Sequence, residues 1–256
     1  LHPALLGYWT DEIEGEAFDP ALVTGVQTMT KMLDPHHPFT ACIAGPSQYA
    51  AFAANADVLG PDVYPVPRDP MTAISTVLDQ AAANQQGRKP VWFFAQGFDW
   101  SVAATGQPDD GKTYRPTGQE LRCMSYLALN HGAKGLCYWA AGNGKCAISR
   151  WPERFGELLA LASELRRLEP VFLSAPQKAR PAVSPAGALD ACLWRVGGKT
   201  TCIIVNTARR PQLMQGALPK LKAGAKVQVL FEDRVLTVGK DLVDVFAPLD
   251  VHVYQW

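Results

Sequence analysis

The chain has 256 residues, with 24 basic and 24 acidic side chains, and therefore carries no formal net charge at pH 7. Hydrophobic residues make up 48% and charged residues 19%, which excludes a disordered polar chain and allows a sizeable core. No apolar run reaches the roughly 18 residues of a membrane-spanning helix, and a neutral chain is not expected to bind nucleic acid. The six cysteines form no Cys-x-x-Cys pair, so we expect no metal and no cofactor.

Over the first 170 residues, short apolar runs alternate with helical patterns. Asp19-Pro20 predicts a helix start, because Asp caps a helix and Pro favours its first turn. Thr117-x-x-Glu120 predicts a capping box. We expect strands over residues 4–9, 39–44, 58–64, 91–95 and 135–139, and helices beginning near Pro20, Ser47, Pro70, Thr117 and Glu153. The expected buried stripes are Leu22, Val26, Met29 and Leu33 in the first helix, Ile74, Val77, Leu78 and Ala81 in the third, and Leu158, Leu161 and Leu165 in the last.

Strands buried on both faces that alternate with helices are typical of a parallel sheet, either doubly wound or closed into a barrel. No Gly-x-Gly-x-x-Gly follows any strand, which argues against a dinucleotide-binding or other cofactor-dependent α/β enzyme. Carboxylates, amides and aromatic residues follow the strands instead. Barrel enzymes keep their catalytic groups at these carboxyl ends, so the pattern favours a (β/α)8 barrel.

Helical periodicity disappears after residue 170. Five short β segments separated by turns predict an all-β sandwich over residues 179–256, with residues 1–170 as the barrel portion. Cys192 and Cys202 flank a Gly197-Gly198 turn, so a disulfide across this hairpin is one alternative to two free thiols. His252 is expected to be a strand residue with no chemical role. The expected strands are 189–196, 200–206, 226–231, 234–238 and 251–256.

Aromatic residues lie beside carboxylates at the predicted strand ends, and this combination suits a sugar. Indole rings stack on the apolar face of a sugar, while carboxylates and amides bind its hydroxyl groups. Glycoside hydrolysis needs a protonated carboxylic acid, and the adjacent Asp11 and Glu12 can push each other's pKa values apart. The candidate substrate-binding residues at the other strand ends are Asp62, Tyr64, Gln96, Asp99, Trp100 and Trp139.

These motifs, in this order, resemble strands four to eight of the clan A glycoside hydrolases over roughly residues 2–170. In that family an Asn-Glu pair ends strand four, with Glu as the acid/base, and Asp11-Glu12 matches it with Asp in place of Asn. Tyr64 matches the strand-six Tyr, and Trp139 matches the strand-eight Trp. Residues 89–96 resemble strand seven, but Gln96 stands where the family has its nucleophilic Glu. The β domain is similar to those that often follow such barrels.

The amide of Gln96 cannot form a stable glycosyl ester, so ordinary double displacement through this position is excluded. Four alternatives follow. Asp99 or Glu14 supplies the second carboxylate; the substrate's N-acetyl group is the nucleophile; the residue is an engineered Glu-to-Gln replacement; or the protein binds glycans without cleaving them. Asp109-Asp110 is weak evidence for calcium.

The sequence therefore predicts a glycosidase with Glu12 as general acid/base and Asp11 orienting the substrate or tuning Glu12. The alternative is an inactive carbohydrate-binding relative on the same barrel. We expect an oligosaccharide or polysaccharide substrate and a secreted or periplasmic location. A whole barrel needs about 250 residues, so we expect the chain, which starts at Leu1, to be a piece of a longer protein whose first three strands come from another segment or from a second chain.

Overall fold

Five parallel strands curl into half of a barrel in the computed structural model, which describes residues 3–12, 19–100, 115–140 and 147–256. The strands lie in the order β1-β2-β3-β4-β5, so each pairs with the next along the chain. Together with the antiparallel sheets that follow, this confirms the predicted C-terminal part of a barrel with an all-β domain. The strands are β1 (Tyr8–Thr10), β2 (Phe39–Ile43), β3 (Val58–Val63), β4 (Trp92–Gln96) and β5 (Gly135–Trp139).

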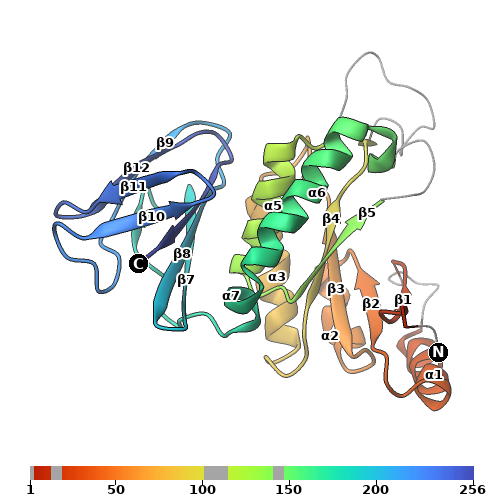
Figure 1. Cartoon of the computed structure of the whole chain (residues 1–256). Helices are drawn as coiled ribbons and strands as arrows, with labels where there is room; N and C mark the ends of the chain where they lie inside the picture. Colours follow the sequence, from red (N-terminus) through yellow and green to blue (C-terminus); the bar gives the residue numbers. More distant parts are fainter. Residues whose placement is uncertain (1–2, 13–18, 101–114, 141–146) are drawn as a thin grey trace.

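Helices α3, α5 and α6 cover one face of this sheet (Figure 1). Asp19 caps α1 by accepting the Ala21 N–H at 2.8 Å, and Thr117 and Glu120 form the predicted capping box of α5. The helices are α1 (Pro20–Leu33), α2 (Tyr49–Ala53), α3 (Thr72–Asn84), α5 (Gly118–Asn130), α6 (Pro152–Arg167) and α7 (Glu169–Leu173), with 3₁₀ turns η1 (Pro46–Gln48) and η2 (Ile148–Arg150).

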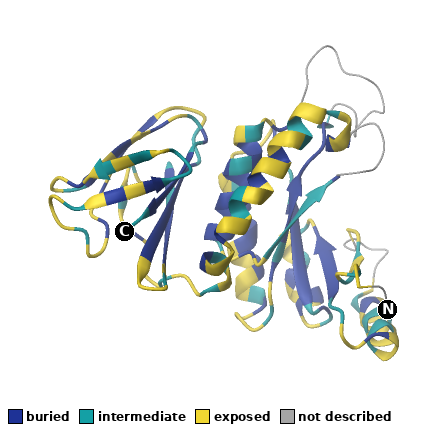
Figure 2. Cartoon of the chain, in the orientation of Figure 1, coloured by how far each residue is buried: buried dark blue, intermediate teal, exposed yellow. Residues whose placement is uncertain are grey.

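Strand alternation decides which side chains meet the helices. In β2, Phe39, Ala41 and Ile43 belong to the core beneath the helices, while Thr40 points to the opposite face, where it lines a cavity. The predicted stripe of α3 is buried as expected, and so are Leu158 and Leu161 of α6. The dark blue of the sheet and of the inner helix faces marks this core (Figure 2).

The stripe predicted for α1 is wrong as a buried face. Leu22, Met29 and Leu33 are 57%, 58% and 79% exposed, and Val23 is the buried side chain of this helix. The physical reason is that α1 follows the edge strand β1, so only one side of the helix meets the rest of the described fold. Leu22, Met29 and Leu33 do form an apolar face of α1, but no described element covers that face.

Two element starts also differ from the prediction. Strand β1 covers Tyr8–Thr10, because its pairing with β2 begins at Tyr8. Helix α3 starts at Thr72 and not at Pro70, because the Asp69 N–H donates to the Pro65 carbonyl at 2.8 Å and closes a separate turn first.

The β domain consists of a five-stranded sheet, β11-β10-β13-β8-β7, and a three-stranded sheet, β12-β9-β6. The sequence analysis missed β6, β9 and β12, which together form the smaller sheet. Polar residues obscure their alternation: β12 buries Asp244 between Leu242 and Phe246. The strands are β6 (Val183–Ser184), β7 (Leu189–Val196), β8 (Lys199–Asn206), β9 (Gln212–Gly216), β10 (Lys226–Leu230), β11 (Arg234–Thr237), β12 (Leu242–Phe246) and β13 (Val251–Gln255).

Cys192 and Cys202 lie on neighbouring strands but face opposite sides of the sheet. Cys192 pairs with Ile203 in the register, and Cys202 pairs with Leu193. Their side chains therefore enter different apolar clusters, and both thiols are free. The disulfide alternative is wrong, because a shift of one residue along a strand reverses the side-chain direction.

The β domain packs against the outer side of the helices (Figure 1). Trp194, Ile203 and Val251 belong to the same apolar core as Leu121 and Tyr126 of α5. Polar contacts reinforce this junction: Arg122 Nη1 donates to the Val251 carbonyl at 2.6 Å, Arg209 pairs with Glu120 at 2.5 Å, and Asn130 donates to Asp190 at 2.7 Å. The two parts are therefore held together by both apolar and charged contacts.

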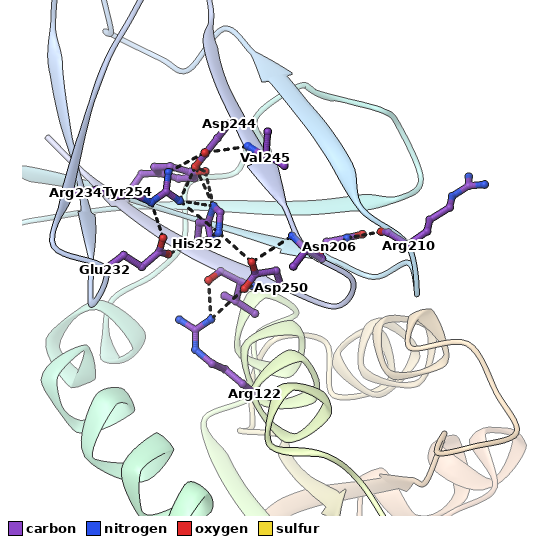
Figure 3. Close-up of polar contacts among 12 residues, drawn as sticks. Arg122, Asn206, Arg210, Glu232, Arg234, Asp244, Val245, Asp250, His252 and Tyr254 are labelled. Carbon is purple, nitrogen blue, oxygen red and sulfur yellow. Dashed lines mark hydrogen bonds and ion pairs between the residues drawn. The ribbon is translucent and has the colours of Figure 1, made fainter.

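His252 lies in β13, as predicted, and a buried polar network surrounds it (Figure 3). Its Nδ1 lies 2.9 Å from Asp244, and its Nε2 lies 3.2 Å from Asp250. Arg234 and Tyr254 also bond Asp244, at 2.8 Å and 2.7 Å. Burial opposes the charged imidazole, but the bonds to Asp244 and Asp250 outweigh it and raise the pKa of His252. The network joins β11, β12 and β13 across the two sheets.

None of the helices in the described ranges combines the length and the apolar character that crossing a bilayer requires.

Candidate functional site

The parallel strands bring aromatic side chains together on the sheet face opposite the helices. The Trp9 ring stacks on Phe94, with centroids 5.4 Å apart and planes 12° apart, and it lies 5.9 Å from the ring of Trp139. Trp9 stays 48% exposed. Its neighbour Tyr8 points to the helix side, where its hydroxyl donates to Asp34. Three strands, β1, β4 and β5, thus supply one aromatic wall.

This wall borders a cavity of about 430 Å³. Gly60 leaves room for Phe94 in the neighbouring strand, since a Cβ at this position would lie 2.6 Å from the ring. Most of its lining residues are apolar or aromatic. Its lining residues are Leu6, Gly7, Tyr8, Trp9, Thr40, Trp92, Phe94, Cys137, Tyr138, Trp139 and Ala140.

Asp11 and Glu12 follow β1 directly, and both are exposed. Glu12 has a φ of 34°, in the left-handed region that few non-glycine residues adopt. Burial raises the pKa of the Cys42 thiol, and the carboxylates of Asp62, Asp11 and Glu12 raise it further. The Glu12 backbone also bonds this thiol. The ends of β1, β2 and β3 therefore form one electrostatic neighbourhood that contains Glu12.

Asp62 and Tyr64 lie at the end of β3 in the same neighbourhood. Asp62 is 2% exposed, and both of its carboxylate oxygens are buried. Burial raises the pKa of the Tyr64 hydroxyl, and so does Asp62, which interacts by charge and by a hydrogen bond; Cys42 and Glu12 also contribute. Tyr64 is thus a neutral hydroxyl held by a buried carboxylate, within the electrostatic reach of Glu12.

Gln96 ends β4 and is fully buried. Its Oε1 accepts the Val66 N–H at 2.9 Å, and its Nε2 donates to the Val66 carbonyl at 2.9 Å and to the Phe98 carbonyl at 3.4 Å. The side chain therefore clamps the loop that follows β3, the loop that carries Tyr64. Gln96 is not among the residues that line the cavity.

A second aromatic cluster consists of Tyr64, Phe98 and Trp100. Phe98 lies edge-on to both rings, at 5.0 Å from Tyr64 and 4.9 Å from Trp100. The Trp100 indole N–H donates to the Tyr64 carbonyl at 3.4 Å, and the guanidinium of Arg68 lies 5.2 Å above the indole. This cluster holds the Tyr64 loop from the side opposite to Gln96.

Asp99 and the loops above it complete the set of predicted site residues. Asp99 is 3% exposed, and its Oδ2 lies 3.8 Å from Nε of Arg115. Glu14, Asp109 and Asp110 lie outside the described residues. Within the described ranges, no group of three or more His, Cys, Asp or Glu side chains is placed to hold a metal ion.

The structure thus brings Glu12, Asp62 and Tyr64 into one electrostatic neighbourhood at the ends of β1 and β3, on either side of β2, with Trp139 on the aromatic wall. Sequence reasoning missed Trp9, Phe94 and Cys42 as parts of the site. Their signal was the alternation of each strand: Trp9 is two residues before Asp11, Phe94 is two before Gln96, and Thr40 and Cys42 share one face of β2.

No protein-family model and no curated protein sequence matches this chain. Solved structures do resemble it. A GH42 β-galactosidase from G. stearothermophilus is 8% identical with a TM-score of 0.61, over 91% of this chain and 66% of its own. A GH30 endoxylanase from Clostridium papyrosolvens is 12% identical with a TM-score of 0.54, over 98% and 65%. An α-amylase from Geobacillus thermoleovorans is 11% identical with a TM-score of 0.57, over 93% and 57%.

These similarities show the fold: the chain has the architecture of the later part of a TIM-barrel glycoside hydrolase with a following β domain. It spans 57% to 66% of the length of these three structures.

Proposed function

We propose that the protein hydrolyses an O-glycosidic bond, with Glu12 as the general acid/base. One observation carries the proposal: Glu12 is an exposed carboxyl group two residues after the end of β1, the strand whose Trp9 lines a cavity together with Phe94 and Trp139. Aromatic rings of this kind stack on sugars, and a carboxylic acid above them can protonate the leaving oxygen. Asp11 orients the substrate or tunes Glu12.

The second catalytic group is proposed to come from the substrate. Asp62, in the electrostatic neighbourhood of Glu12, and Asp99, which follows β4, are 2% and 3% exposed, and the Gln96 amide is bonded to Val66. Asp11, the exposed carboxylate next to Glu12, is assigned to the substrate or to Glu12 itself. In the substrate-assisted route, the N-acetyl carbonyl oxygen attacks C1 while Glu12 gives its proton to the leaving oxygen. Glu12 then takes a proton from the water that opens the cyclic intermediate, and so recovers its acidic form.

The remaining site residues are proposed to shape the sugar subsite. Asp62 holds the Tyr64 hydroxyl, Gln96 fixes the Tyr64 loop through Val66, and Trp100 packs beneath that loop. Trp139 provides a stacking surface. Gln96 thus acts by positioning, in place of the direct substrate contact predicted from the sequence.

We also propose that further strand–helix units complete the barrel, either from another segment of the protein or from a second chain. Strand β1 is an edge strand, and the exposed apolar residues beside it form a surface of the kind that proteins usually cover. These residues are Leu6 (70% exposed), Trp9 (48%), Leu22 (57%), Met29 (58%), Met32 (81%) and Leu33 (79%).

The second candidate function is carbohydrate binding without cleavage. It is favoured by Gln96, which stands where clan A glycoside hydrolases have their nucleophilic Glu. The Gln96 side chain forms hydrogen bonds with the backbone of Val66. In both cases the proposed partner is an oligosaccharide or polysaccharide, and the proposed location is secreted or periplasmic.

Hydrolysis of aryl glycosides with and without a 2-acetamido group tests the proposal. We expect turnover of the acetamido substrate, a loss of about 10²- to 10⁴-fold in Glu12→Gln, and no change in the control Glu169→Gln, an exposed glutamate of α7. Binding of the same sugars without any turnover would support the inactive relative instead.

A further inference from the structure

A second cavity, of about 480 Å³, lies where α5 and α6 begin. It is distinct from the aromatic cavity beside Glu12 and shares no lining residue with it. Its lining residues are Arg115, Thr117, Arg150, Trp151, Pro152, Glu153 and Arg154.

The lining is dominated by positive charge, with three guanidinium groups against the single carboxylate of Glu153 among the described lining residues. Arg115 reaches Asp99 only at 3.8 Å, and Arg154 forms an ion pair with Glu157. A guanidinium has five N–H donors, so such contacts leave donors available. In Arg154, Nε is buried and has no hydrogen-bond partner among the described residues.

The start of α6 adds backbone N–H donors, which favour an anion as the arginines do. This helix has 16 residues, its first position is Pro152, and no side chain caps it. The backbone N–H groups of Glu153 and Arg154 thus lie in the first turn, where the positive end of the helix dipole favours an anion. An anion in this cavity would meet guanidinium and backbone donors together.

The cavity is joined to the proposed sugar site through short contacts. Arg115, which pairs with Asp99, also lies over the Trp151 ring at 4.8 Å from its centroid. Phe98 of the second aromatic cluster forms a β-bridge with Ala147, just before the 3₁₀ turn that carries Arg150. Arg115 and the 3₁₀ turn η2 are therefore linked by these contacts to Asp99 and Phe98, which follow β4.

We propose that this cavity binds an acidic group of the glycan, a sugar carboxylate or a sulfate ester, at a subsite remote from Glu12. The inference rests on the proposed function and deepens it: the substrate is an anionic glycan, and Arg115, Arg150 and Arg154 select it. Planar guanidinium groups match both carboxylate and sulfate oxygens, and Trp151 provides an apolar surface for the ring that carries them.

The test is a titration of the ¹⁵N-labelled protein that follows the Trp151 indole N–H, which is identified with Trp151→Phe. The probes share one skeleton: D-glucuronic acid, D-glucose 6-sulfate and D-glucose. We expect the indole signal to shift with one or both acidic sugars and not with D-glucose. A response to glucuronic acid alone assigns a carboxylate, and a response to the sulfate alone assigns a sulfate ester.

Arg150→Gln and Arg154→Gln should each weaken this binding about tenfold. The control Arg195→Gln removes an exposed charge in the β domain and should bind as the parent does. Arg150 is exposed, so its variant keeps the test valid even where Arg154→Gln disturbs the fold.

Equal shifts with D-glucose, no shift with either acid, or unchanged affinity in both arginine variants would overturn the inference. Its failure is separable from that of the proposed function, because binding at Trp151 requires no turnover. Hydrolysis that depends on Glu12 but shows no acid-dependent shift would remove only the anion subsite.

Discussion

Replacing Gln96 by Glu is the most informative single change, because it restores the residue type found in the resembled family at a position that the structure uses differently. Here the side chain is fully buried, and its Nε2 donates to the carbonyls of Val66 and Phe98. A carboxylate cannot donate, so Gln96→Glu would set a buried negative charge against two carbonyl oxygens. The protein escapes that repulsion only by keeping the new carboxyl group protonated.

The size of the expected stability loss follows from the free energy needed to keep the new carboxyl group protonated. An ordinary Glu has a pKa of about 4.3, so holding it protonated at pH 7 costs about 3.7 kcal/mol, and at pH 5 about 1 kcal/mol. The protonated acid keeps one donor and can replace most of the Gln96 bonds. Since the folded-state pKa of the new group is raised, stability is retained at low pH and lost as the pH rises. We therefore expect Gln96→Glu to lose about 3 to 4 kcal/mol at pH 7.

Urea unfolding followed by tryptophan fluorescence at pH 5 and pH 7 measures this difference. Gln80→Glu, at an exposed position of α3, is the matched control and should change little at either pH. The reasoning is refuted if Gln96→Glu is as stable as the parent at pH 7, or if its loss is the same at both pH values. New glycosidase activity in Gln96→Glu that the parent lacks would contradict the substrate-assisted mechanism.

Three further changes have expected outcomes. Hydrogen bonds hold the pKa of Asp244 well below its usual range, against the opposing effect of burial. The stability that these bonds provide should be lost as the pH falls through that pKa. Asp244→Asn should therefore show a weaker dependence of the melting temperature on acid pH. The pKa of His252 is raised, so its contribution should instead be lost as the pH rises above that value, and an NMR titration of its ring reports the midpoint. Thr117→Ala removes the capping box and should cost about 1 kcal/mol in urea unfolding, with Thr76→Ala on an exposed face of α3 as the control.

The order of strands and helices in the half-barrel could be predicted from the sequence because local signals mark them. Asp19 and Thr117 cap helices by bonds within four residues, and the continuous apolar runs of β2 and β4 are typical of parallel strands that are buried on both faces. The direction of each side chain from a strand could also be read from alternation once one residue was placed.

The partners of polar side chains could not be predicted. Gln96 reaches Val66, 30 residues away, and the sequence holds no signal for that contact. The exposure of the α1 stripe could not be predicted for a similar reason. Met29 and Leu33 form an apolar face, but whether that face is buried depends on what packs against it. Strand β12 was missed because Asp244 interrupts its apolar positions. The bonds from Arg234, His252 and Tyr254 explain the buried carboxylate there.

The central claim is that Glu12 protonates the leaving oxygen, and the dependence of rate on the leaving group tests it most directly. A leaving group as acidic as 2,4-dinitrophenol needs no protonation, whereas an alkyl alcohol does. With acetamido glycosides of both kinds we compare kcat/KM, which reports the departure of the leaving group and not the later step in which Glu12 activates water. In Glu12→Gln it should fall about 10²- to 10⁴-fold on the alkyl glycoside and little on the dinitrophenyl glycoside. An equal loss on both substrates, or no loss on the alkyl glycoside, would contradict the assignment of Glu12 as the general acid.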